Sequence, residues 1–556
     1  MAETVKERLL KQLAQLKNER TSFEPHWRDL SDFINPRGSR FLTSDVNRDD
    51  RRNTKIVDPT GSLAQRILSS GMMSGITSPA RPWFKLATPD PDMMDYGPVK
   101  IWLEVVQRRM NEVFNKSNLY QSLPIMYSSI GTYGTAAMAV LDDDQDVIRT
   151  MPFPIGCYYL ANSPRGSVDT SFRQFSMTVR QLVQEFGLEN VSTSVKSMFE
   201  NGTYEQWIEI NHCIMPNINR DTGKLDSKNK PFKSVYFETG GDNDKLLRES
   251  GYDEFPIMAP RWEVNGEDVY ASSCPGMLAL GQVKALQVEQ RRKAQLIDKA
   301  TNPPMVGPTS LKNQRVSLLP GDVTYLDVMT GQDGFKPAYL VNPNTADLLA
   351  DIQDTRQIIN SSYFVDLFMM LQNINTRSMP VEAVIEMKEE KLLMLGPVLE
   401  RLNDECLNPL IDRTFSIMVR KNMLPPPPDV LQGMPLRIEY ISVMAQAQKS
   451  IGLTSLSQTV GFIGQLAQAK PEALDKLDVD QAIDAFAEMS GVSPTVIVPQ
   501  EQVQGIREER AKQQQAAMAM QMGQAAAQGA KTLSETQTTD PSLLTAIANA
   551  SGAPQQ

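Results

Sequence analysis

Residues 275–304 read PGMLALGQVKALQVEQRRKAQLIDKATNPP, and this stretch decides the fold of the middle of the chain. It predicts a helix over about Pro275–Ala300, which is 26 residues and therefore roughly 39 Å long. Asn302, Pro303 and Pro304 end this helix sharply, because proline lacks a backbone N–H and restricts the residue before it.

A second long helix is predicted downstream, over about Thr345–Leu371. Its residues at helical spacing form one stripe: Leu349, Ile352, Arg356, Ile359, Tyr363 and Leu367. Residues 303–343, between the two helices, are rich in Gly, Pro and β-formers, so they predict a small compact insertion.

A polar loop, Gln372–Met379, leads from the second helix into a third, which starts at about Pro380. Pro397 and Pro409 lie inside this third helix and predict bends, because each removes a backbone donor. Pro425–Pro428 then forms a stiff linker. Shorter helices and a Gln/Ala/Met-rich tail follow, and the last residues are polar.

The first half of the chain predicts a mixed α+β fold. Helices are expected over about residues 3–20, near Ser62–Gly71 and within residues 98–130. From Thr135 to about Glu263, short β-branched and aromatic runs predict antiparallel hairpins. One helix interrupts the hairpins, since Thr178 and Gln181 form a capping box and Gly187 supplies a stop.

Composition bounds the class of protein. The chain has 556 residues, with 56 Lys+Arg against 66 Asp+Glu, a net charge of −10. This length predicts three or four structural units of about 150 residues each. The chain contains no run of about 18 apolar residues, so no membrane span is predicted. Its start has no apolar signal segment.

Residues suited to catalysis or metal binding are scarce. The four cysteines lie far apart, and the two histidines are His26 and His212, of which His212 is expected to point into a sheet core. No phosphate-binding loop, dinucleotide fingerprint, nucleophile elbow or HExxH motif occurs. The cluster Asp142–Asp146 fits either a divalent cation or, more simply, a solvated hairpin turn. We expect no enzyme activity, no cofactor and no metal.

Several separated motifs resemble the portal proteins, or head-to-tail connectors, of short-tailed T7-like bacteriophages. The resemblance spans about residues 5–440. Its main part is Met379–Ile411. The end of this part, extended by two residues, reads Glu405-Cys406-Leu407-Asn408-Pro409-Leu410-Ile411-Asp412-Arg413. Trp27–Pro36, Asp58-Pro59-Thr60-Gly61 and Ala80-Arg81-Pro82-Trp83-Phe84 precede it in the same order as in that family.

The resemblance implies a ring, with twelve subunits, at one capsid vertex. Double-stranded DNA would be packaged and later ejected through this ring, and the tail would attach to it. The implied parts are a wing (1–274), first stem helix (275–302), clip (303–344), second stem helix (345–371), tunnel loop (372–379), long kinked wing/crown helix (380–428), crown (429–500) and C-terminal barrel helix with a disordered tail (501–556).

The resemblance also implies partners and a location. The partners are further copies of the chain, DNA in the channel, the terminase packaging motor, a tail adaptor or tail tube protein, major capsid and scaffolding proteins, and internal core proteins. The location is the head–tail junction of the virion, after assembly in the host cytoplasm and without membrane insertion. A metal-dependent DNA-processing hydrolase and an oligomeric α+β structural protein of another kind are the alternatives.

Two sets of residues are candidates for contact with DNA. The first is the loop, with Gln372, Asn373, Asn375 and Arg377; Arg377 could bind phosphate or instead pair with Glu382. The second is the basic face of the first long helix: Lys284, Arg291, Arg292 and Lys299. With Lys293 against Glu289 and Asp298, this helix has a net charge of +3. Its basic face fits either rings of charge around DNA or a solvated face with intersubunit ion pairs.

Overall fold

The computed structural model describes most of the chain in two compact units, Met1–Pro91 with Trp102–Gln448, and Asp92–Ile101 with Lys449–Gln556. The described residues are 3–42, 52–80, 82–88, 90, 93, 96–224, 226–242, 245–306, 336–337, 345–372, 395–431, 437–440, 456–467, 470, 472, 477–490, 498 and 500–535.

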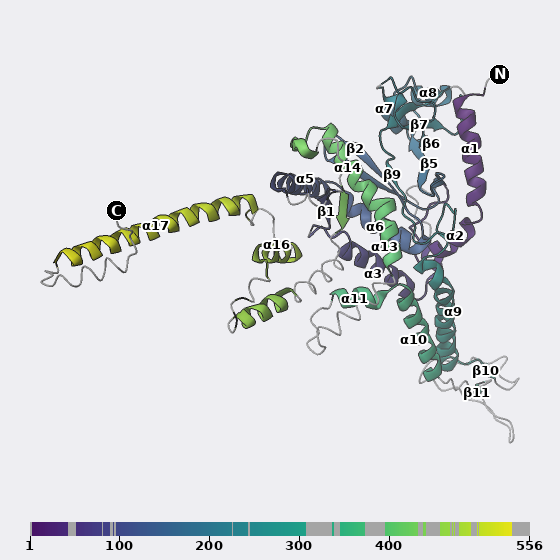
Figure 1. Cartoon of the computed structure of the whole chain (residues 1–556). Coiled ribbons are helices and arrows are strands. Elements are labelled where there is room, and N and C mark those ends of the chain that lie inside the picture. The colour runs from purple at the N-terminus through teal and green to yellow at the C-terminus, as the bar shows by residue number, and fades with distance from the viewer. Residues whose placement is uncertain are drawn as a thin grey trace. The chain divides into compact units, whose positions relative to one another are not determined.

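A five-stranded antiparallel sheet forms one part of the first unit. Its strand order is β4-β5-β6-β7-β8, with bounds Tyr158–Asn162, Val168–Thr178, Trp207–Pro216, Phe232–Glu238 and Arg248–Tyr252. Helix α1 (Val5–Arg20) runs along this sheet (Figure 1), and its Leu9 and Leu13 pack on Phe172 and Phe237. Helices α7 (Val179–Phe186) and α8 (Thr193–Glu200) contribute to a second apolar cluster on the sheet. The sequence predicted this α+β arrangement correctly.

A second sheet and a group of helices complete the core of this unit. The sheet has the order β3-β2-β9, with bounds Val147–Phe153, Ala137–Asp143 and Ile257–Met258. The helices nearby are α2 (Glu24–Phe33), α3 (Thr60–Gly75), α5 (Gly97–Lys116) and α6 (Leu119–Tyr133), with the short 3-10 turn η2 (Arg52–Lys55). Strands β1 (Phe84–Ala87) and β12 (Arg437–Tyr440) pair with each other.

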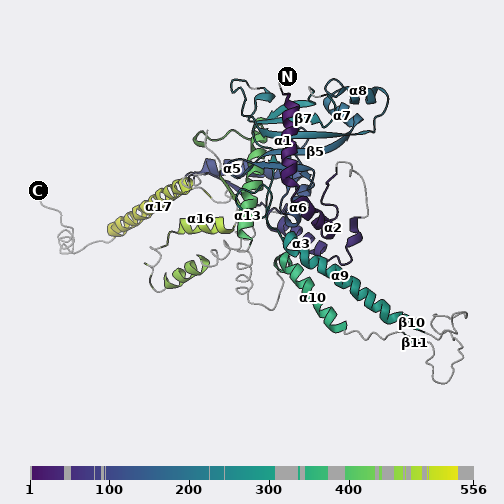
Figure 2. The same cartoon turned by 90° about the vertical axis from the view of Figure 1, so that its right-hand side faces the viewer.

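Two long helices, α9 (Pro275–Thr301) and α10 (Thr345–Ser362), lie side by side and run in opposite directions (Figures 1 and 2). The short pair β10 (Met305–Val306) and β11 (Lys336–Pro337) lies at their far end. Helix α9 has the extent that the sequence predicts. The other residues of the predicted insertion, 307–335 and 338–344, lie outside the described residues.

The prediction of one continuous helix over residues 345–371 is wrong. The chain breaks after α10 at Phe364, whose φ is +54°, and continues as α11 (Val365–Gln372). The break changes the direction of the chain, so that Phe368 packs on Gly71 of α3. A Cβ atom at position 71 would clash with the Phe368 ring. Tyr363 is fully buried beside the break. Tertiary packing therefore breaks a helix in which no glycine or proline marks the position.

The third predicted helix differs in its detail. Pro397 occupies the first turn of α13 (Gly396–Leu402), where no intrahelical N–H is needed, so it starts this helix and does not bend it. A π-helical turn (Asn403–Leu407) follows, and α14 (Asn408–Arg420) comes next. The α-helical pattern thus changes directly before Pro409, which cannot donate to the carbonyl of Glu405. Residues 380–394 of this prediction lie outside the described residues.

The second unit is helical where it is described. It contains α16 (Val479–Ser490) and α17 (Gln500–Glu535), a helix of 36 residues whose described side chains are almost all exposed. Arg507 of α17 forms an ion pair with Asp480 of α16 at 2.6 Å. Within the described parts of both units, no helix is long and apolar enough to cross a membrane.

Candidate functional site

The near half of α9, residues Pro275–Gln287, is fixed firmly in the first unit. Cys274 caps the helix and Pro275 occupies its first turn. Gly276 lies so close to the backbone of Thr132 in α6 that a Cβ atom would overlap its carbonyl. Val283 is fully buried and packs against Gly61 of α3. Small residues therefore let three helices approach closely at the base of the α9–α10 pair.

A polar network around Asp58, which we call the Asp58 junction, ties both long helices to the start of α3. The Asp58 side chain is 3% exposed and accepts hydrogen bonds from the Thr60 backbone and hydroxyl. Gln290 of α9 donates to Asp58 Oδ2 at 3.0 Å, and Arg356 of α10 forms an ion pair with the same oxygen at 2.6 Å. Gln287 binds the backbone of Asp58 in both directions. One aspartate thus holds three helices together.

The carboxylates of this region experience opposite electrostatic effects. Burial pushes the pKa of Asp58 up, but hydrogen bonds from Thr60 and Arg356 outweigh it and hold the pKa below its usual value. Burial, together with the nearby charge of Asp351, raises the pKa of Glu289. The negative charge is therefore stabilised at Asp58 and disfavoured at Glu289.

The predicted basic face of α9 divides into two parts in the structure. Lys284 pairs with Asp29 of α2 at 2.6 Å, with its ammonium 5.4 Å from the Phe33 ring centroid. Arg291 donates to the Lys55 carbonyl at 3.4 Å. Arg292 and Lys299 are exposed, and neither forms an ion pair with another residue that the structure describes. The first two side chains are therefore engaged within the chain, and the last two are available to another molecule.

The loop residues of the first candidate set fall almost entirely outside the described part of the chain. Gln372 is the last residue of α11. Asn373, Asn375 and Arg377 lie in the segment 373–394, which is not described. Their proposed contact with DNA, and the alternative pairing of Arg377 with Glu382, stay predictions.

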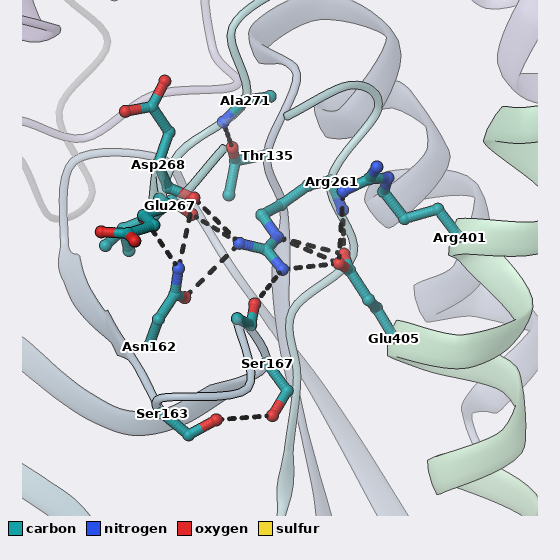
Figure 3. Close-up of polar contacts among 12 residues, drawn as sticks. Thr135, Asn162, Ser163, Ser167, Arg261, Glu267, Asp268, Ala271, Arg401 and Glu405 are labelled. Carbon is teal, nitrogen blue, oxygen red and sulfur yellow. Dashed lines mark hydrogen bonds and ion pairs between the residues drawn. The ribbon is translucent and has the colours of Figure 1, made fainter. Parts of the chain in front are cut away.

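A second buried network, which we call the Arg261 joint, fastens the π-helical turn to the loops of the sheet region (Figure 3). The Arg261 side chain is 3% exposed and forms an ion pair with Glu405 at 2.6 Å, while its backbone N–H donates to the same carboxylate at 2.9 Å. Its guanidinium also donates to the carbonyls of Gly166 and Asp268, at 2.8 and 3.1 Å. Arg401 lies on the other side of Glu405 at 3.8 Å.

The motif Glu405–Arg413 is also held at its other end by a buried arginine. Arg413 is buried and donates to the Val140 carbonyl of β2 at 2.7 Å and to Glu254 at 3.0 Å. The apolar residues between Glu405 and Arg413 are also buried: Leu407, Leu410 and Ile411. The residues from Glu405 to Arg413 thus dock α14 onto both sheets, and their spacing serves packing.

Residues that could suggest chemistry have structural roles instead. Asp143 accepts hydrogen bonds from the backbone of Gln145 and Asp146 in the β2–β3 turn, and Asp142 pairs with Lys421 at 2.7 Å. This confirms the hairpin-turn interpretation of the cluster. His212 is buried, bonds Ser234 at 2.9 Å and stacks on Tyr236, as expected for a core position. Burial lowers the pKa of His212 well below its usual value. Among the described residues, no group of three His, Cys, Asp or Glu side chains could hold a metal.

Comparison with known proteins identifies the family of this chain. The sequence profile of the family described as "Bacteriophage head to tail connecting protein" matches residues 6–498. The "Portal protein" of Salmonella phage epsilon15 is 91% identical over 556 residues, which cover 100% of both chains. The "Probable portal protein" of Bordetella phage BPP-1 is 45% identical over 551 residues, 99% of each chain. The chain therefore belongs to the family of bacteriophage head-to-tail connecting proteins.

Sequence reasoning noticed the motif residues Asp58, Glu405 and Arg413 but assigned them no role. It missed their partners Arg356, Arg261 and Glu254, which are between 144 and 298 positions away along the chain. The signal available in the sequence was a charge directly before apolar residues, as at Glu405-Cys406-Leu407, because a buried charge requires a partner. The sequence does not say which residue that partner is.

Proposed function

We propose that this chain forms a closed ring, with twelve subunits, at one vertex of a phage capsid. Double-stranded DNA passes through the ring during packaging and ejection, and the tail attaches to it. The chain acts as a structural protein and not as an enzyme. The match to the head-to-tail connecting family over residues 6–498 is the observation that carries this proposal.

The far half of the α9–α10 pair supports assembly with further copies. Large apolar side chains there are exposed in the single chain: Val288 is 45% exposed, Ile297 50%, Leu349 41% and Ile358 41%. Leaving these side chains in water forgoes the free energy that their burial would supply. A ring would bury such surfaces, because each subunit has a neighbour on both sides.

DNA contacts are proposed for the loop after α11. Asn373, Asn375 and Gln372 supply polar amides that contact phosphates weakly, and Arg377 supplies the one guanidinium that can bind phosphate with two hydrogen bonds. Weak contacts suit a channel, because strong neutralisation of many phosphates would hold the DNA in place. The net charge of −10 also fits a wall along which DNA slides.

The other partners follow from the proposed parts of the ring. The segment around β10 and β11 would meet the terminase motor during filling and the tail adaptor or tail tube afterwards. The sheet-containing part of the first unit would face the major capsid and scaffolding proteins, and the C-terminal part would face internal core proteins. Helix α17 would extend the channel as a helical barrel. The ring would assemble in the host cytoplasm and remain at the head–tail junction.

Electron microscopy of the purified chain tests the proposal. We expect closed rings with a central channel, and native mass spectrometry should give the mass of twelve chains of 62.0 kDa. Phage carrying Arg377→Ala should form normal rings yet package or retain less DNA, with Arg377→Lys as the conservative control. A chain that stays monomeric at all concentrations would contradict the ring. A mutant phage that fills and holds its genome like wild type would contradict the role of Arg377.

A further inference from the structure

Exposed apolar residues lie on opposite faces of the α9–α10 pair, which extends away from the sheets of its unit (Figure 2). Val288 and Ile297 of α9 are nine positions apart, and so are Leu349 and Ile358 of α10. Nine residues make about two and a half helical turns, so the two members of each couple point in opposite directions. Each helix therefore carries one exposed apolar side chain on either face of the pair.

The Asp58 junction shows which of these residues share a face. Gln290 and Arg356 bind the same Asp58 oxygen, so both point to one side of the pair, which we call the Asp58 face. Ile297 and Leu349 each lie seven positions farther from the sheets than these two residues. Seven residues are nearly two full turns, so Ile297 and Leu349 form one apolar patch on the Asp58 face.

The opposite face, which we call the Val288 face, carries the other patch. Val288 and Ile358 lie just over half a turn around their helices from the two residues that bind Asp58. Exposed charges of both signs lie on the same face: Arg292, Lys299, Asp351 and Asp354. The exposed neighbours of the patch on the Asp58 face carry no charge: Ala294, Thr301 and Gln353. One face is thus an apolar patch with a charged rim and the other is uncharged, a combination that suits protein–protein contact.

We propose that the Ile297–Leu349 patch of one copy of this chain docks on the Val288–Ile358 patch of a neighbouring copy. The inference rests on the proposed ring and specifies one of its subunit contacts. Rotation around the ring places each helix beside the same helix of the neighbour, so Ile297 meets Val288 and Leu349 meets Ile358. Each copy turns one face to each of its two neighbours, so the contact repeats head to tail and closes the ring.

This contact displaces neighbouring copies along the pair. The residue on the Asp58 face lies nine positions farther out than its counterpart, which is roughly 13.5 Å at 1.5 Å per residue. Rotation about a ring axis leaves heights unchanged, so the helix pair must lean relative to that axis. The same displacement brings Gly281 of the neighbour, on its Val288 face, to the level of Gln290, where Asp58 covers the Asp58 face. A Cβ atom at Gly281 would have no neighbour within 4 Å, so this position leaves room for that cover.

Disulfide formation between subunits tests the pairing. Val288→Cys and Ile297→Cys in one chain lie on opposite sides of α9 and roughly 13.5 Å apart along it, too far for a bond within the chain. Oxidised rings of this double variant should give a ladder of covalent multimers on a denaturing gel, whereas the four native cysteines are buried. Leu349→Cys with Ile358→Cys repeats the test on α10. Arg292→Cys with Ile297→Cys is the matched control and should give far fewer multimers, because position 292 lies about 6 Å from the expected level.

A charge introduced into the patch tests its contribution to assembly. Ile297→Asp would bury an unpaired carboxylate at the contact, so it should raise the protein concentration for half assembly by at least about tenfold. Ile218→Asp makes the same change at a residue that is 91% exposed between β6 and β7, and it should assemble like wild type. Both positions are exposed in the single chain, so both variants should melt at the wild-type temperature.

The outcomes separate this inference from the proposed ring. Wild-type rings without a ladder from either cysteine pair would overturn the contact, and so would Ile297→Asp rings that form as readily as wild type. Covalent dimers from Val288→Cys or Ile297→Cys alone would mean that like faces meet, which would also overturn it. Absence of rings in the wild-type chain would instead overturn the proposed function.

Discussion

The Arg261 joint and the far half of the α9–α10 pair use charge in opposite ways. In the joint, Arg261 finds a carboxylate and several carbonyls within the same chain, and its own side chain is only 3% exposed. On the far half of the pair, Arg292 and Asp354 remain exposed and unpaired within the described residues. The first arrangement fixes the fold of one subunit, because a buried charge without its partner is costly. The second leaves charge and apolar surface available for assembly.

The largest effect is expected when one side of the joint is removed. Arg261→Ala leaves the largely buried Glu405 carboxylate with only the more distant Arg401, so the free energy of unfolding should fall by up to about 3–5 kcal/mol. Urea unfolding of the single chain, at a concentration too low for the proposed rings to form, measures this change. Arg292→Ala is the matched control, because its exposed guanidinium should contribute less than about 1 kcal/mol there. Equal losses of unfolding free energy in Arg261→Ala and Arg292→Ala would contradict the contrast between the Arg261 joint and the far half of the α9–α10 pair.

Two glycines of α9 should respond in opposite directions. Gly276→Ala forces a Cβ atom into the backbone of Thr132, so it should destabilise the chain by about 1–3 kcal/mol. Gly281→Ala meets no atom within 4 Å, so its better helix propensity should stabilise the chain by up to about 1 kcal/mol. Circular dichroism melting of both variants checks the signs. A stabilising Gly276→Ala would show that the near half of α9 is not packed against α6 as described.

The Asp58 junction should give stability that depends on pH. The pKa of the Asp58 carboxyl is lower in the folded chain than in the unfolded chain. Its contribution to stability is therefore present above about pH 4 and is lost as the pH falls through the folded pKa. Asp58→Asn should therefore cost about 1–2 kcal/mol near neutral pH and progressively less in acid. Denaturation of both proteins over a pH series measures this difference. A difference that stays constant with pH would mean that the carboxylate charge does not hold the helices.

The smallest effect is expected at Glu289, where the charge is disfavoured. Its raised pKa means that folding is favoured by protonation, so stability should increase as the pH falls toward that value. Glu289→Gln removes the cost of burying a charge there and the repulsion from Asp351, so it should raise the melting temperature slightly at neutral pH. The gain should shrink in acid, where wild-type Glu289 is already protonated. A lower melting temperature for the variant would indicate that Glu289 has a cationic partner.

Local signals in the sequence predicted much of the fold. The capping box of Thr178 and Gln181 starts α7, and Gly187 ends it, because these signals act within a few residues. The end of α9 could equally be predicted from Pro303 and Pro304, which follow it directly. The break at Phe364 was not readable, because it depends on the burial of Tyr363 and Phe368 against residues far away in the chain.

The candidate site was predictable in kind but not in its arrangement. Composition and spacing located a basic face on α9, yet four similar cations proved to have different surroundings. Lys284 and Arg291 contact α2 and η2, more than 200 positions upstream, whereas Arg292 and Lys299 do not. Helical spacing gives the direction of a side chain relative to its own helix. It does not give the identity of the element that covers that face.

The sequence by itself determined the helix boundaries set by prolines, caps and turn residues, the likeness to phage connectors, and the charges of α9 and α10. These properties depend on neighbouring residues or on counting, so they need no knowledge of the fold. Tertiary structure alone decided that Asp58 joins Gln290 to Arg356, that Arg261 receives Glu405, and that Phe364 turns the chain. The physical reason is that a buried charge or ring is stabilised by whichever distant residues the whole chain brings around it.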